Sequence, residues 1–118
     1  RLRELQRRLP GDSEIWVGDI ADASAAEALL AAACNAFGRA DILINNAGLL
    51  SIRPMEQIDL ALASRVLAVN LEAVIRLSYT FAAHFKQQGG GALINVSSIG
   101  AFMTVPMAVL KVLRRRYA

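Results

Sequence analysis

Polar and small residues follow each of three predicted strands, at the point where each strand ends. The first ends in Gly18-Asp19, the second in Asn45-Asn46-Ala47-Gly48, and the third in Asn95-Val96-Ser97-Ser98. An aspartate there can accept a hydrogen bond from an amino group, a serine can donate to a carbonyl oxygen, and Ala-Gly lets a flat ligand approach the backbone. Ligands bind beyond the carboxyl ends of open parallel sheets. A single strand end of this composition is typical of helix caps and turns, but three such strand ends together favour a binding site.

The elements that must position these residues alternate along the chain between helix and strand. Apolar residues recur at helical spacing in the helices, and they run in short continuous blocks in the strands. This alternation predicts parallel strands joined by right-handed crossovers in a single α/β unit. The expected elements are helix 1–9, strand 14–19, helix 22–38, strand 41–48, helix 59–87 and strand 92–98.

Composition and charge exclude several classes of protein. Hydrophobic residues make up 55% of the 118 residues, which excludes disorder, and no apolar stretch is long enough to span a membrane. The net charge of +3 comes from the basic ends 1–8 and 111–116, while residues 9–110 carry five basic and nine acidic side chains. We therefore expect no nucleic-acid partner and no membrane association. The single cysteine and the lack of a signal peptide indicate a cytoplasmic protein.

Local signals add detail to the helices. Ser24 with Glu27 forms a predicted capping box at the start of the second helix, and Gly38 ends it. Cys34 lies in an alanine-rich helical stretch and is expected to be buried and inert. His84, late in the long helix, is expected to be exposed and without a role.

Four segments in order, GDIAD, GRADILINNAG, VNLEAVIRLSYTF and GGGALINVSSIGAF, resemble short-chain dehydrogenase/reductases over about residues 1–106. The resemblance implies a partial Rossmann-like doubly wound parallel sheet, with strands matching 3, 4 and 5 of the family order and flanking helices. The whole chain, 1–118, is then a single incomplete domain, and residues 107–118 are a divergent basic tail.

The resemblance also implies cofactor-binding residues for NAD or NADP. Asp19 matches the position that contacts the adenine ring, and Ile20 follows it in the same cofactor-binding stretch. Asn46, Ala47 and Gly48 match the stretch that stabilises the central sheet and borders the cofactor ribose.

Two catalytic positions are implied in the same way. Ser98 matches the serine that polarises the carbonyl of a small-molecule carbonyl or alcohol substrate, with Ser97 as its structural neighbour. Asn70 matches the helix asparagine whose local distortion holds a water for proton relay. A merely solvent-facing Asn70 is the alternative.

The sequence departs from the family in two places, and both concern machinery that the reaction needs. It contains no TGxxxGxG turn, the segment whose backbone N–H groups bind the cofactor pyrophosphate. The catalytic tyrosine is expected near Lys111 and its lysine partner near Arg115, whereas Tyr117 comes too late. We therefore expect the chain alone to be inactive, and a frameshift near Lys111 is one hypothesis for its tail.

The missing strands leave other outcomes open. In the family order two strands separate strand 14–19 from strand 41–48, a gap of roughly 14 Å. Either strand 14–19 moves across to pair with strand 41–48, or a partner protein fills the gap, or the chain is marginally stable.

The alternative function is a non-catalytic remnant that pairs with a full-length relative. A pull-down against such a relative would discriminate between this function and that of an enzyme fragment. Helix residues Leu67, Leu71, Val74 and Leu77 either form a homo-oligomer interface or, for most of them, pack on the sheet.

Overall fold

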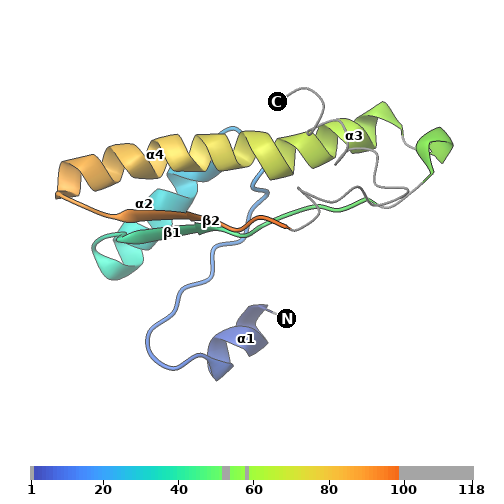
Figure 1. Ribbon diagram of the computed structural model, residues 1–118. Helices are drawn as coiled ribbons and strands as arrows, with labels where there is room; N and C mark the ends of the chain where they lie inside the picture. Colours follow the sequence, from blue (N-terminus) through green and yellow to red (C-terminus); the bar gives the residue numbers. More distant parts are fainter. Residues whose placement is uncertain (1, 52–53, 58, 99–118) are drawn as a thin grey trace.

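Helices alternate with the strands of one small parallel sheet in the computed structural model, which describes residues 2–51, 54–57 and 59–98 (Figure 1). Lys111, Arg115, Tyr117 and the basic tail 107–118 lie outside these residues. In chain order the elements are α1 (Leu2–Arg8), α2 (Ala25–Phe37), β1 (Ile42–Asn45), the 3₁₀ turn η1 (Met55–Gln57), α3 (Leu60–Leu67), the π-helical turn η2 (Ala68–Glu72), α4 (Ala73–Gln88) and β2 (Ala92–Asn95).

The sheet consists of β1 and β2, paired in parallel as the sequence predicts for neighbouring strands. Ile42 lies opposite Ala92 and Asn45 opposite Asn95, so the two carboxyl ends coincide. Backbone bonds continue the ladder at both ends, from Ala92 N to Asp41 O at 2.9 Å and from Val96 N to Asn45 O at 2.9 Å. This register brings the polar residues after the two strands to one edge.

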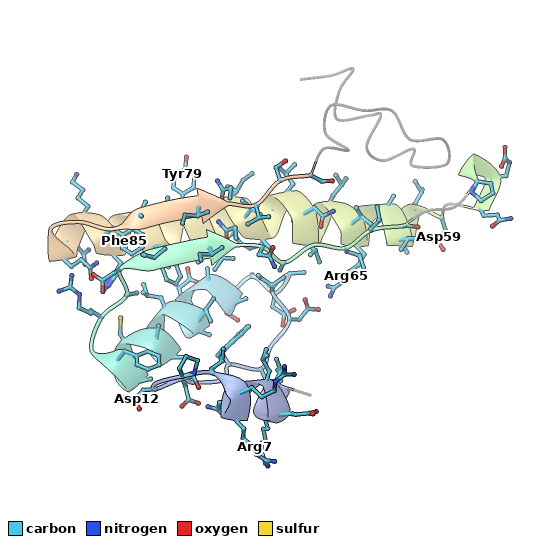
Figure 2. All side chains as sticks on the ribbon, turned by 60° about the horizontal axis from the view of Figure 1, so that its bottom comes forward. Arg7, Asp12, Asp59, Arg65, Tyr79 and Phe85 are labelled. Carbon is cyan, nitrogen blue, oxygen red and sulfur yellow. The ribbon has the colours of Figure 1, made fainter. Side chains whose placement is uncertain are left out.

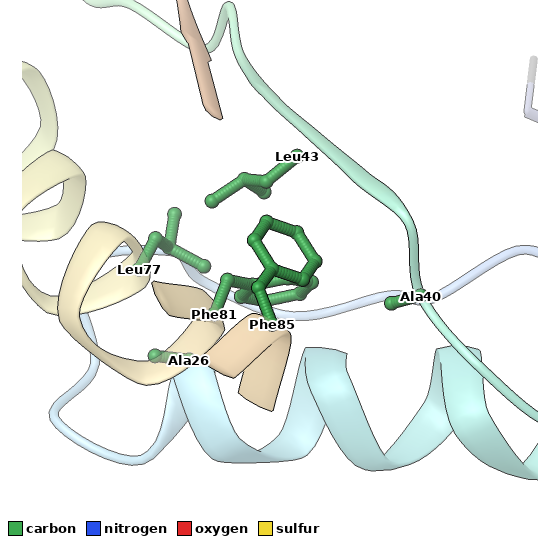
Figure 3. Close-up of a cluster of buried hydrophobic side chains, with 6 residues drawn as sticks. All are labelled: Ala26, Ala40, Leu43, Leu77, Phe81 and Phe85. Atoms are coloured by element: carbon green, nitrogen blue, oxygen red, sulfur yellow. The ribbon is translucent and has the colours of Figure 1, made fainter. Parts of the chain in front are cut away.

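The core lies between β1, α2 and α4 (Figure 3). Leu43 points from β1 toward α4, where Phe81 and Phe85 meet edge to face with ring centroids 6.0 Å apart. Burying each such side chain contributes about 1.5–3 kcal/mol. The buried cluster comprises Ala26, Ala40, Leu43, Leu77, Phe81 and Phe85.

The opposite face of the sheet is exposed in the described part of the chain. Ile42 and Ile44 alternate with the buried Leu43 and are 58% and 57% exposed, and Ile94 beside them is 44% exposed. The continuous apolar run of β1 predicts cover on both faces, as parallel sheets normally have. The described residues supply that cover on one face only.

The strand predicted over residues 14–19 does not form. Residues 12–17 have no strand pairing, and Figure 1 shows that this stretch and α1 lie apart from the sheet. A strand needs a neighbour for its backbone groups, and the family strands that would separate this segment from β1 are not in the sequence. The segment instead follows the predicted helix α1, where Gln6 Nε2 donates to Ser13 O at 2.6 Å.

The long helix predicted over 59–87 is confirmed as α3, η2 and α4 in direct succession. Asp59 caps its start, accepting a hydrogen bond from Leu62 N at 2.6 Å, and Gly89 ends it in the left-handed region at φ +91°. Leu77 packs in the core, whereas Leu67 and Leu71 are 49% and 50% exposed. The leucine positions of this helix are therefore divided between the sheet side and the outer side.

Three smaller expectations were wrong. Ser24 makes no capping hydrogen bond from its side chain, because its backbone is already helical at φ −87° and ψ 0°. Cys34 is half-buried rather than buried, and His84 is half-buried rather than exposed. The two side chains meet between α2 and α4, with Cys34 Sγ 3.9 Å from His84 Nε2.

Two leucines of the long helix test which of its faces stabilises the fold. Leu77→Ala should lower the free energy of unfolding by about 2–5 kcal/mol, because it opens a cavity in the core. Leu71→Ala, at a position that is 50% exposed, should change it by about 0.5 kcal/mol or less. Urea denaturation followed by circular dichroism measures both variants. Equal losses would contradict the assignment of the core to β1, α2 and α4.

Candidate functional site

The ends of the two strands are joined by a pair of asparagines. Asn45 is buried, and its Nδ2 donates to Asn95 Oδ1 at 2.8 Å and to Ser78 Oγ of α4 at 3.4 Å. Among the described residues, its Oδ1 has no hydrogen-bond partner. Sequence reasoning treated both asparagines only as part of the strand ends. The signal for their pairing was present, since both strands end in the same three residues, Leu-Ile-Asn.

Asn70 ties the loop after β1 to the long helix. Its Oδ1 accepts a hydrogen bond from Leu49 N at 2.7 Å, and its Nδ2 donates to Leu49 O at 2.7 Å. The side-chain amide thus satisfies both the N–H and the C=O of Leu49, as the backbone of a neighbouring strand would. Asn70 lies inside the π-helical turn η2, so the local distortion expected at this asparagine is present. Asn70 is exposed, and its side chain is bonded to the Leu49 backbone rather than facing solvent alone.

Asp19 lies in the loop before α2 and is held by two donors. Ala21 N donates to its Oδ1 at 2.9 Å, and Arg65 Nη2 of α3 donates to its Oδ2 at 2.5 Å. The hydrogen bond from the Ala21 backbone, followed by the one from Arg65, lowers the pKa of Asp19 below its ordinary value. The carboxylate is therefore ionised at neutral pH and remains partly open to solvent.

A second arginine holds the same loop. Arg76 Nη2 of α4 donates to Ala21 O at 2.9 Å, and its Nη1 lies 3.6 Å from Glu72 Oε2. In Figure 2, Arg65 extends from the long helix on the side of the stretch that carries Asp19. Sequence reasoning missed both arginines. Their spacing of about three helical turns, which places them on one side of the helix, was the only signal.

The remaining predicted residues surround the same edge of the sheet. Asn46, Ala47 and Gly48 follow β1 and are exposed, and Ser98 is exposed beyond the end of β2. Ile20 and Ala47 help to line a small apolar cavity of about 60 Å³. That space holds a few waters at most, so a nucleotide would have to lie across the strand ends rather than inside the cavity.

Other kinds of site find no support in the part of the chain that the structure describes. Residues 2–51, 54–57 and 59–98 contain no group of three or more histidine, cysteine, aspartate or glutamate side chains placed to hold a metal ion. No helix among them has the length and apolar character needed to cross a bilayer.

Comparisons with known proteins match this arrangement. The family model described as short chain dehydrogenase matches residues 1–110. Identity is 33% to D-threitol dehydrogenase of Mycolicibacterium smegmatis, over 89% of this chain and 42% of that protein. It is 39% to L-rhamnose 1-dehydrogenase (NAD(P)(+)) of Azotobacter vinelandii, over 79% of this chain and 37% of that protein.

The fold has solved counterparts as well. The crystal structure of a metagenomic short-chain oxidoreductase in complex with NADP superposes with a TM-score of 0.82 at 29% identity. The match covers 96% of this chain but 53% of that one. The chain thus spans about 40% of the length of the curated relatives that it matches.

The paired hydrogen bonds of Asn70 can be tested by hydrogen exchange. Asn70→Ala should speed exchange of the Leu49 amide by about two- to tenfold, because an exposed hydrogen bond contributes roughly 0.5–1.5 kcal/mol net. Asn70→Asp keeps one acceptor oxygen but loses the donor to Leu49 O, so protection should also fall. Asn35→Ala, an exposed asparagine of α2, is the matched control and should leave Leu49 unchanged. Unaltered exchange of the Leu49 amide in both Asn70 variants would contradict these two hydrogen bonds.

Proposed function

This chain belongs to the short-chain dehydrogenase family, and from that premise we propose that it forms one part of an NAD(P) site in an oxidoreductase. The substrate class we propose is a small carbonyl compound or the corresponding alcohol. The observation that carries the proposal is the meeting of Asn70, the loop after β1 and the loop of Asp19 at one edge of the sheet. Ligands of open parallel sheets bind at that edge.

The residues present fit the adenosine side of a dinucleotide. Asp19 is ionised and partly exposed, so it can accept a hydrogen bond from the amino group of an adenine. Ile20 beside it offers apolar contact to the base. After β1, the small side chains of Ala47 and Gly48 leave the backbone approachable, and the adjacent Asn46 completes the stretch that would border the ribose.

The catalytic half of the proposal concerns two residues. Ser98, beyond β2, would donate a hydrogen bond to the carbonyl oxygen of the substrate and polarise it. Asn70 would hold a water in a proton relay, because the π-helical turn changes the direction of backbone groups around it. When bound, the nicotinamide cofactor supplies the hydride chemistry.

What the sequence does not contain limits this chain when it acts alone. It has no glycine-rich turn for the pyrophosphate and no tyrosine–lysine pair at the family spacing after Ser98. We therefore propose that the 118 residues by themselves do not turn over substrate. The single cysteine fits a reducing compartment, and we propose the cytoplasm.

The alternative function is association with a full-length relative, without catalysis by this chain. The outer side of the long helix favours it, because Leu67, Leu71, Ile75 and Tyr79 are 49%, 50%, 48% and 79% exposed at a spacing of four residues. Such a stripe lies along one side of a helix. This alternative requires a complete relative as partner, whereas the leading proposal requires none.

Cofactor binding by the isolated chain is the first test. Titration calorimetry with NAD or NADP at micromolar concentrations should give no binding heat, because the phosphates find no helix N-terminus with a glycine-rich turn. Steady-state assays with NADPH and simple ketones should show no turnover. Measurable carbonyl reduction by the purified 118-residue chain would contradict this proposal.

A chimaera tests the residue roles. Residues 1–98 of this chain would replace the matching part of the metagenomic oxidoreductase, which then supplies the preceding and following segments. We expect NADPH-dependent carbonyl reduction, lowered by about 10²–10³ in Ser98→Ala through loss of a donor to the developing charge. Ser97→Ala is the matched control and should retain activity. Equal activity of both serine variants would remove Ser98 from the proposed mechanism.

A further inference from the structure

The loop of Asp19 has no place in the sheet, so its position depends on side-chain contacts. Residues 12–17 before it have no strand pairing, and the loop is ordered internally by the backbone turn from Asp22 N to Asp19 O at 3.1 Å and by the bond from Ala21 N to Asp19 Oδ1 at 2.9 Å. Ile20 packs against the core cluster, and two arginines of the long helix add polar contacts to this loop. Arg65 binds the Asp19 carboxylate, and Arg76 binds the backbone at Ala21 O.

We infer that Arg65 is a positioning residue that orients the Asp19 carboxylate for recognition of an amino group on a nucleoside base. This inference rests on the proposed function and assigns the orientation of one contact within it. Arg65 itself acts through Asp19 and not on the ligand. Its guanidinium fixes the carboxylate from the side of α3, 46 residues along the chain.

The geometry leaves the carboxylate able to accept a further bond. An ionised carboxylate offers about four lone-pair sites. Ala21 N uses one on Oδ1 and Arg65 uses one on Oδ2. The side chains of Arg65 and Asp19 are 47% and 39% exposed, so a ligand can reach the remaining sites. Without Arg65 the carboxylate would keep its bond from Ala21 N but lose the second donor, which fixes the position of Oδ2.

The contribution of Arg65 can be separated from that of Arg76. Arg76 restrains the same loop through a backbone carbonyl and has its own counter-ion in Glu72, so it does not touch the Asp19 carboxylate. Asp22 lies in the same loop and carries a further charge close to Asp19, to whose O its backbone N donates at 3.1 Å. Loss of Arg76 should therefore loosen the loop without changing the protonation of Asp19.

The test uses the full chain and adenosine, which carries no phosphate that Arg65 might bind directly. Saturation-transfer NMR at millimolar adenosine should give an affinity about two- to fivefold weaker for Arg65→Gln, the range expected for loss of an exposed ion pair. Arg65→Lys keeps the charge and should retain part of the affinity. Arg39→Gln removes a comparable exposed arginine, paired with Asp41, and should have no effect.

A pH profile separates positioning from a general loss of structure. The pKa of Asp19 is lowered in the folded chain, so its ionised contacts are present above the ordinary pKa and are lost as pH falls through the lowered value. Adenosine binding should fall over the same pH range. In Arg65→Gln, carbon NMR should show the Asp19 pKa rising, and the binding midpoint should move to higher pH. Arg76→Gln should move neither.

The outcomes distinguish this inference from the function on which it rests. Weaker adenosine binding in Arg65→Gln with a shifted midpoint, and unchanged binding in Arg39→Gln, would support it. Wild-type chain that binds adenosine no more tightly than Arg65→Gln would overturn it and leave the proposed function standing. Wild-type chain that does not bind adenosine at all, even at millimolar concentration, would overturn the adenosine site in the proposed function, and the inference with it.

Discussion

The packing of β1 against α4 is the contact on which the rest of the structure depends. Leu43 of the strand meets Leu77 and Phe81 of the helix, and this burial fixes which face of the sheet is covered. Because side chains of a strand alternate, the same contact decides that Ile42 and Ile44 face away. The same contact fixes the position of β1 along the axis of the long helix. Asn45 therefore reaches Ser78, and the residues after β1 reach the π-helical turn.

Polar contacts hold the loop after β1 and the loop of Asp19 against the long helix, and these contacts differ in strength. Asn70 holds Leu49 through two neutral hydrogen bonds, each worth about 0.5–1.5 kcal/mol net. Asp19 is held on an exposed surface, where solvent screens an ion pair such as that with Arg65 and leaves it a small contribution to stability. The loop after β1 is therefore the firmer of the two.

Sequence reasoning succeeded where the determinants are local. Apolar periodicity, Asp59 at the start and Gly89 at the end were sufficient to define the long helix. Apolar runs with a polar end located both strands, although the predicted spans 41–48 and 92–98 were longer than the strands Ile42–Asn45 and Ala92–Asn95 that form. It failed over residues 14–19, because strand formation there depends on neighbours that a local pattern does not report. Family motifs pointed to Asn70 and Asp19, but their partners Leu49 and Arg65 are distant in sequence. Those contacts became visible only when the chain was folded.

The exposed face of the sheet and the proposed site have one physical origin. A dinucleotide site in an open α/β sheet lies where strands on both sides of a switch point contribute loops. The described residues form part of such an open sheet, with β1 at its edge and Ile44 exposed on its face. The superposition on the NADP complex covers nearly all of this chain and about half of that one, so the arrangement is native to the family even though the sheet is partial. We propose that a strand pairing with β1 would satisfy its open backbone edge, that the helix connected to this strand would cover Ile42 and Ile44, and that the turn between them would bring phosphate-binding groups to Ala47 and Gly48. For that reason stability and cofactor affinity should be coupled in this protein.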